Sequence, residues 1–147
     1  MTRFAPALFL SAALFALPAL GGDCTSDLAI DVQGDLQSGV SITVDVTNSL
    51  PDASTFLVVG ENQGSTTIGI GPFGSLTLGI EAPFVVFPLG NADGNGAASA
   101  GFSVAAVPIQ IDPIVTNAQA VAFDVTIGGG AIQLDTCTSN VVTVTIQ

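Results

Sequence analysis

Basic side chains are almost missing from this chain. Arg3 is the one Lys or Arg among 147 residues, and histidine is absent. Binding of nucleic acid depends on Lys or Arg to neutralise phosphates, so the composition excludes nucleic acid as a partner. Anionic membrane surfaces are excluded for the same reason.

Tyrosine and tryptophan are absent as well. A Ser or Cys nucleophile needs a neighbouring base, and without His or Lys the familiar triads and dyads cannot be assembled. Common zinc sites need several His or Cys ligands, and the chain has two cysteines. Paired carboxylates can cleave glycosides, but the Trp and Tyr platforms that stack on sugars are missing. We therefore expect no enzyme, with an acid-dependent hydrolase as the remaining catalytic alternative.

The first 22 residues have the layout of a secretory signal peptide. Arg3 gives a positive start, residues 4–20 form an apolar run, and residues 19–21 offer a small-x-small cleavage site. We expect residues 1–22 to be removed on export, which leaves residues 23–147 as a single domain. The mature chain would then lie in the periplasm, at the cell surface or outside the cell.

Two other interpretations of this segment compete with cleavage. An uncleaved membrane anchor would need a slightly longer run, and Pro18 breaks the end of this one. A lipoprotein attached at Cys24 would need a small residue just before the cysteine, where Asp23 stands. Both observations favour a cleaved signal peptide.

The mature chain is expected to be strongly acidic. All 12 acidic residues follow the cleavage point, so its side-chain charge is −12. Without a basic partner, each carboxylate must be solvated, hydrogen-bonded to backbone N–H groups or bound to a cation. Such a surface repels itself at low ionic strength, so we expect salt or divalent cations to stabilise the fold.

Alternating apolar and polar residues predict strands along the mature chain. Residues 40–47 alternate without a break, and residues 28–33, 121–127 and 142–147 do so as well. Gly, Pro, Asn and Asp clusters separate about eight to ten short strands, and no stretch has a helical period. We expect an all-β, Ig-like antiparallel β-sandwich, with a small barrel or jelly roll as the second choice.

Two segments resemble parts of exported bacterial domains. Residues 75–104 read SLTLGIEAPFVVFPLGNADGNGAASAGFSV, in which a Pro-Phe strand ends in Pro-Leu-Gly before an Asp/Asn-Gly hairpin. Residues 139–146 read SNVVTVTI, which is similar to a recurrent closing strand. Together they resemble uncharacterised secreted bacterial β-sandwich domains of unknown function. The resemblance implies export and a β-sandwich, and it implies no activity or catalytic residue.

One hairpin also matches the start of a calcium loop. Asn91, Asp93 and Asn95 precede Gly96, and alternate oxygen side chains on a tight turn can converge on one hard cation. Two of the three side chains are neutral amides, and Phe102 stands where such a loop usually has Glu. A weak Ca²⁺ site is one interpretation and an ordinary Asp/Asn-Gly turn is the other. No other cofactor is expected.

Two further pairings can be predicted. If the first two strands pair with Ile30 opposite Ile42, then Asp27 faces Asp45 and a cation could lie between them, unless both carboxylates are simply solvated. Cys24 and Cys137 are expected to form one disulfide, since export places them in an oxidising compartment. The alternatives for the cysteines are a lipidated Cys24 and an intermolecular pair.

The composition favours a non-catalytic, exported structural or interaction module over other functions. Its partner would be an unknown protein or a component of the cell envelope. A calcium-dependent binding or adhesion module that uses Asp93 is the first alternative. An acid-dependent hydrolase that uses Asp or Glu is the second.

Overall fold

The computed structural model describes residues 24–107, 109 and 112–147. This part of the chain has nine strands, one 3-10 turn (Gly71–Phe73) and no α-helix, which confirms the all-β expectation. The predicted signal peptide lies outside the described residues. The strands are β1 (Cys24–Asp35), β2 (Gly39–Thr47), β3 (Ser54–Gly60), β4 (Gln63–Gly69), β5 (Ser75–Ile80), β6 (Phe84–Asn91), β7 (Ala98–Val104), β8 (Ile114–Gly128) and β9 (Ala131–Ile146).

Seven of these strands form one mixed sheet in the order β6-β3-β8-β9-β1-β2-β7. Neighbouring strands in this sheet are antiparallel, except β1 and β9, which run parallel to each other. The sheet curls until its two edge strands, β6 and β7, approach each other, so it nearly closes into a barrel. The wholly antiparallel pairing that we expected is therefore wrong, and the barrel held as second choice is nearer to the observed sheet.

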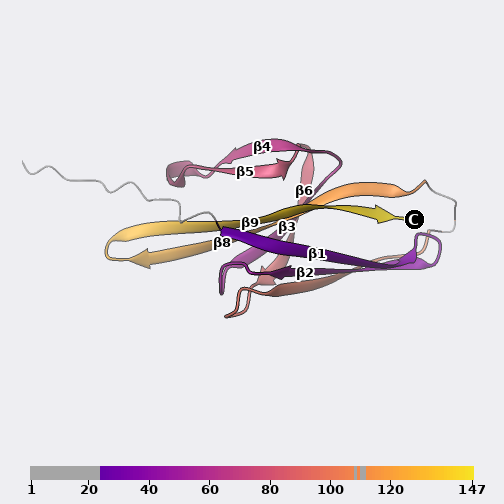
Figure 1. Ribbon diagram of the computed structural model, residues 1–147, viewed down its shortest axis with the longest axis horizontal. Helices are drawn as coiled ribbons and strands as arrows, with labels where there is room; N and C mark the ends of the chain where they lie inside the picture. The colour runs from indigo at the N-terminus through magenta and orange to yellow at the C-terminus, as the bar shows by residue number, and fades with distance from the viewer. Residues whose placement is uncertain (1–23, 108, 110–111) are drawn as a thin grey trace, which may run out of the picture.

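Strands with apolar side chains on both faces explain this architecture. In β3, Leu57 faces the inside of the curled sheet, while Val58 packs on its outer face. In β8, Ala120 likewise faces the inside, while Val121 packs on the outer face. Such central strands need cover on two sides. The curl of the sheet covers the inner face, and the β4–β5 hairpin covers part of the outer face (Figure 1).

Buried amides fasten this hairpin to the sheet. Gln119 accepts a hydrogen bond from the backbone N–H of Gly79 at 2.8 Å and donates one to the carbonyl oxygen of Ser139 at 2.8 Å. Asn117 donates to the carbonyl oxygen of Glu61 at 2.8 Å and accepts from Thr143 at 2.9 Å. Because buried polar groups are costly without partners, these bonds fix the position of the hairpin.

The β8–β9 hairpin extends past the rest of the sheet as a two-stranded arm, residues 124–135 (Figure 1). The pairing of β3 with β8 ends at Phe123, and β1 joins β9 only from Cys137. Val125 and Ile127 on one face of the arm are 57% and 77% exposed. No helix in the described part of the chain is long and apolar enough to cross a membrane.

The inside of the curled sheet has two unlike ends. At the first, which we call the closed end, the loop 92–97 joins β6 to β7 and docks on the segment 48–53. Ser49 donates its backbone N–H to Gly96 at 3.0 Å, and Ala92 donates to Ala53 at 2.8 Å. At the other, the open end, Leu36 donates its backbone N–H to the carbonyl oxygen of Gln147 at 2.7 Å. Figure 1 shows the chain ending there, beside the β1–β2 turn.

Candidate functional site

An apolar pocket of about 320 Å³ lies inside the curled sheet at the open end. All seven strands of the sheet contribute to its wall. Among the described wall residues only Ser103 and Thr116 are polar, and none is charged. The hydroxyl of Thr116 donates to the carbonyl oxygen of Gly60 at 2.9 Å, so its hydrogen is already used. The wall therefore offers shape and apolar contact.

The sheet register places large side chains around this pocket. Ile42 on β2 lies opposite Phe102 on β7, and Leu57 on β3 lies opposite Phe87 on β6. These side chains point inward because alternate residues of a strand share a face. The rings of Phe87 and Phe102 meet edge to face with their centres 5.9 Å apart. The two edge strands of the sheet, β6 and β7, are thus in contact through these side chains.

A second apolar pocket, of about 220 Å³, lies on the outer face beneath the β4–β5 hairpin. Phe56, Phe84 and Phe123 from the sheet and Ile68 from the hairpin contribute to its wall. Phe56 and Phe123 stack edge to face with a centre distance of 6.1 Å. It is smaller than the inner pocket and lies on the opposite face of the sheet.

The three residues of the predicted calcium loop lie exposed at the closed end. Asn91 ends β6, and its side-chain oxygen accepts a bond from Ser54 Oγ at 3.3 Å. Asp93 Oδ1 accepts the backbone N–H of Asn95 at 2.8 Å and that of Ala97 at 2.9 Å. These bonds, that of Ala97 first, hold the pKa of Asp93 below its ordinary value of 3.8. The carboxylate thus fastens the turn.

Carboxylates elsewhere do not gather into a cluster. Within the described residues, no three His, Cys, Asp or Glu side chains lie close enough to hold a metal ion together. Whether Asn91, Asp93 and Asn95 bind Ca²⁺ stays a prediction. At the open end, Asp35 plays the same part as Asp93, because N–H groups and the hydroxyl of the 37–38 turn bond to it, with the Ser38 N–H foremost, and lower its pKa.

The predicted facing of Asp27 and Asp45 is wrong. The register pairs Ile30 with Val44, so Asp27 lies opposite Thr47 and Asp45 lies opposite Ala29. Each β1 residue thus faces a β2 residue two positions later than we expected, because the β1–β2 connection takes up two more residues. The structure instead places Asp124 opposite Asp135 on the arm. Neither of these two aspartates lines the inner pocket.

Cys24 and Cys137 form the predicted disulfide. They pair directly across the parallel strands β1 and β9, with their Cα atoms 4.7 Å apart, and Cys137 is fully buried. Cys24 is the first residue of β1, and Cys137 lies within β9. The bridge spans 113 residues of sequence.

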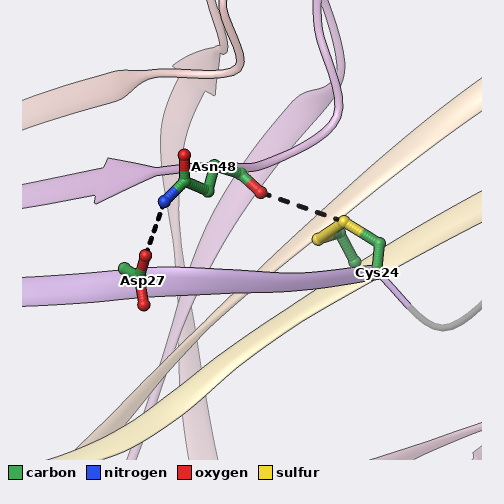
Figure 2. The surroundings of a disulfide bond; sticks show 4 residues. Cys24, Asp27 and Asn48 are labelled. Carbon is green, nitrogen blue, oxygen red and sulfur yellow. Dashed lines mark hydrogen bonds between the residues drawn. A yellow bond between two sulfur atoms is a disulfide. The ribbon is translucent and has the colours of Figure 1, made fainter.

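Asn48 lies beside the disulfide at the closed end and contacts both Asp27 and Cys24 (Figure 2). Its side-chain nitrogen donates to Asp27 Oδ2 at 2.7 Å, and its carbonyl oxygen lies 4.0 Å from Sγ of Cys24. Because a disulfide sulfur has no hydrogen to donate, the second interaction is a packing contact. Asn48 has a positive φ of 56°, a conformation that asparagine tolerates better than most residues.

The sequence did not predict the inner pocket, because almost none of its wall residues is polar and none is charged. Its wall residues carry the same apolar alternation as the filled core, and this alternation gives no sign of where the interior stays empty. Comparison with known proteins adds no functional assignment: no protein family, curated protein or solved structure matches this chain.

Proposed function

We propose that the mature chain is a non-catalytic, exported interaction module that binds a ligand in the inner pocket. The observation that carries the proposal is the pocket itself, about 320 Å³ of apolar space at the open end of the curled sheet. Ligand sites in proteins are typically concave, mostly apolar and lined by a few polar groups. A packed core seldom leaves so much space unfilled.

The chemistry of the wall supports binding rather than catalysis. A general acid or base must reach the substrate within hydrogen-bond distance, and no described wall residue carries an ionisable side chain. Ser103 is the nearest to a nucleophile, yet His and Lys are absent from the whole sequence. Asp93 is engaged in its turn, so the structure offers less support for a calcium-dependent module than for the pocket.

Export forms the second part of the proposal. The buried Cys24–Cys137 disulfide suits an oxidising, extracytoplasmic compartment, because such bonds are rare in reducing cytoplasm. The Ig-like relation to secreted bacterial domains stays part of the proposal and rests on residues 75–104 and 139–146. Lipidation of Cys24 is disfavoured because its sulfur is in the bridge.

The proposal can be tested on protein isolated from its own cells. Extraction with organic solvent and mass spectrometry should find a small molecule retained with the wild type. Val59→Phe, which places a ring in the pocket, should remove it, whereas Val125→Phe on the exposed arm should not. The pocket proposal fails if both variants retain the molecule. Saturable turnover in a glycosidase and peptidase screen, lost on Asp→Asn substitution, would contradict the non-catalytic part.

A further inference from the structure

We infer that the inner pocket takes a compact, uncharged apolar molecule and rejects anionic amphiphiles such as fatty acids. The inference rests on the proposed function, since it names the class of ligand for the same pocket. It follows from three observations: the volume of the pocket, the charges around it and the way its mouth is built.

The volume limits the size of the ligand. A dry cavity of about 150 Å³ holds one benzene molecule, and ligand pockets begin near about 300 Å³. The inner pocket, at about 320 Å³, has room for two or three linked rings or a short branched chain. A long acyl chain would have to leave most of its length in water.

The charges select against anions. No described wall residue is charged, and the only Lys or Arg of the sequence is Arg3, within the predicted signal peptide. A carboxylate or sulfonate carried into the pocket would lose hydration and find no counter-charge. If its headgroup stayed at the mouth, it would still meet the field of a chain with a side-chain charge of −12 after residue 22.

The mouth is built from apolar edge residues. Phe87 on β6 and Val104 on β7 are 39% and 38% exposed, although both line the pocket. β6 and β7 are the two edges of the sheet, and each is paired with a different neighbour. A ligand can pass between them by displacing the contact of Phe87 with Phe102, and no strand ladder has to open.

A pair of matched probes tests the inference on the mature protein with its disulfide intact. N-phenyl-1-naphthylamine is uncharged, and 8-anilinonaphthalene-1-sulfonate is the same ring system with one sulfonate. We expect saturable fluorescence enhancement with the uncharged probe. The anionic probe should bind roughly tenfold more weakly or worse, and high salt should narrow the gap because it screens the surface.

Variants locate the binding. Val59→Phe should lower the affinity for the uncharged probe roughly tenfold or more, because its ring occupies the same space. Ile68→Phe fills the outer pocket in the same manner and should leave the affinity unchanged. Ile42→Phe replaces Val59→Phe if the latter does not unfold cooperatively in a thermal melt.

The outcomes distinguish an error in the ligand class from an error in the binding site. If the sulfonate binds as tightly as the uncharged probe and Val59→Phe abolishes both, the ligand class is wrong and the proposed binding site survives. If the uncharged probe ignores Val59→Phe and Ile42→Phe, or is lost with Ile68→Phe, the inner pocket is not the site and the proposed function falls as well.

Discussion

The closed and open ends of the curled sheet are built by the same strands and yet differ in how they fill their interior. At the closed end, Ala98 and Ala120 lie among Leu28, Val46 and Leu89 in one buried cluster. Their small side chains let the strands and the 92–97 loop approach closely. At the open end, larger side chains on the same strands line a space that they do not fill.

The difference shows that alternation decides which way a side chain points, and side-chain volume decides whether the space is closed. Stability is expected to concentrate at the closed end, which also holds the disulfide and the docking of the 92–97 loop. Binding is expected at the open end, where empty space is available. Four experiments can break or sharpen this division.

The largest expected effect is the loss of the disulfide at the closed end. The double variant Cys24→Ala/Cys137→Ala should lower the free energy of unfolding by about 4 kcal/mol, because the bridge closes a loop of 113 residues in the unfolded chain. Urea denaturation measures it. The control is the wild type unfolded in the presence of a reductant, and its free energy of unfolding should approach that of the variant. A loss below about 1 kcal/mol would show that the closed end does not depend on the bridge.

The second largest effect is expected at a glycine in the 92–97 loop. Gly96 has a φ of +76°, and a Cβ there would overlap the carbonyl oxygen of Ser49. Gly96→Ala should therefore cost about 3 kcal/mol, since both the backbone conformation and the docking suffer. Gly94→Ala, two residues earlier with nothing near its Cβ, should change stability by about 0.5 kcal/mol or less. Equal effects of the two in thermal melts would contradict the account of the loop.

Enlarged side chains compare the interiors directly. Ala120→Leu at the closed end should lower the free energy of unfolding by about 2 kcal/mol, because the packed cluster has no room for it. Val59→Phe at the open end should be neutral or raise it by about 1 kcal/mol, because the added ring fills empty space. Denaturant titration of both variants decides the point. A loss with Val59→Phe as large as that with Ala120→Leu would mean that the pocket is not open to a ring.

The smallest expected effect is in acid, at the two turn carboxylates. In the folded protein the pKa of Asp93 and that of Asp35 lie below the ordinary value of 3.8. The stabilisation from each is therefore complete above that value and is lost as the pH falls through the lowered folded pKa. Asp93→Asn and Asp35→Asn should each lower the melting midpoint slightly at neutral pH. As the pH falls below 3.8 the difference from wild type should shrink, and a difference independent of pH would refute this role.

The sequence predicted the local structure better than the pairing. Alternation identified strands at residues 28–33 and 40–47, because one face of each is buried or half-buried and the other is exposed. It identified residues 121–127 and 142–147 but missed that β8 and β9 run for 15 and 16 residues, since β8 is buried on both faces over residues 117–122 and such a stretch does not alternate. The parallel meeting of β1 with β9 depends on contacts between the two ends of the chain, which no local pattern records.

The sequence predicted less of the candidate site than of the fold. The disulfide could be predicted because two cysteines in an exported chain leave few choices. The pocket could not, because Ile42, Val59 and Phe102 have the same pattern as residues that fill a core. Register also lay beyond reach: the spacing around residues 35–39 permitted more than one turn, and the choice of turn moved Asp27 away from Asp45.

The parallel pairing of β1 with β9 at the disulfide has a mechanical consequence. A pull on the backbone just before Cys24 would be transmitted through the two sulfur atoms to Cys137, in a strand bonded to neighbours on both sides. Tension would thus load the middle of the sheet as a whole, and β1 could not be peeled away one hydrogen bond at a time. Under reducing conditions the same pull would act on β1 alone, so the bridge would turn the first residue of β1 into a force-bearing anchor.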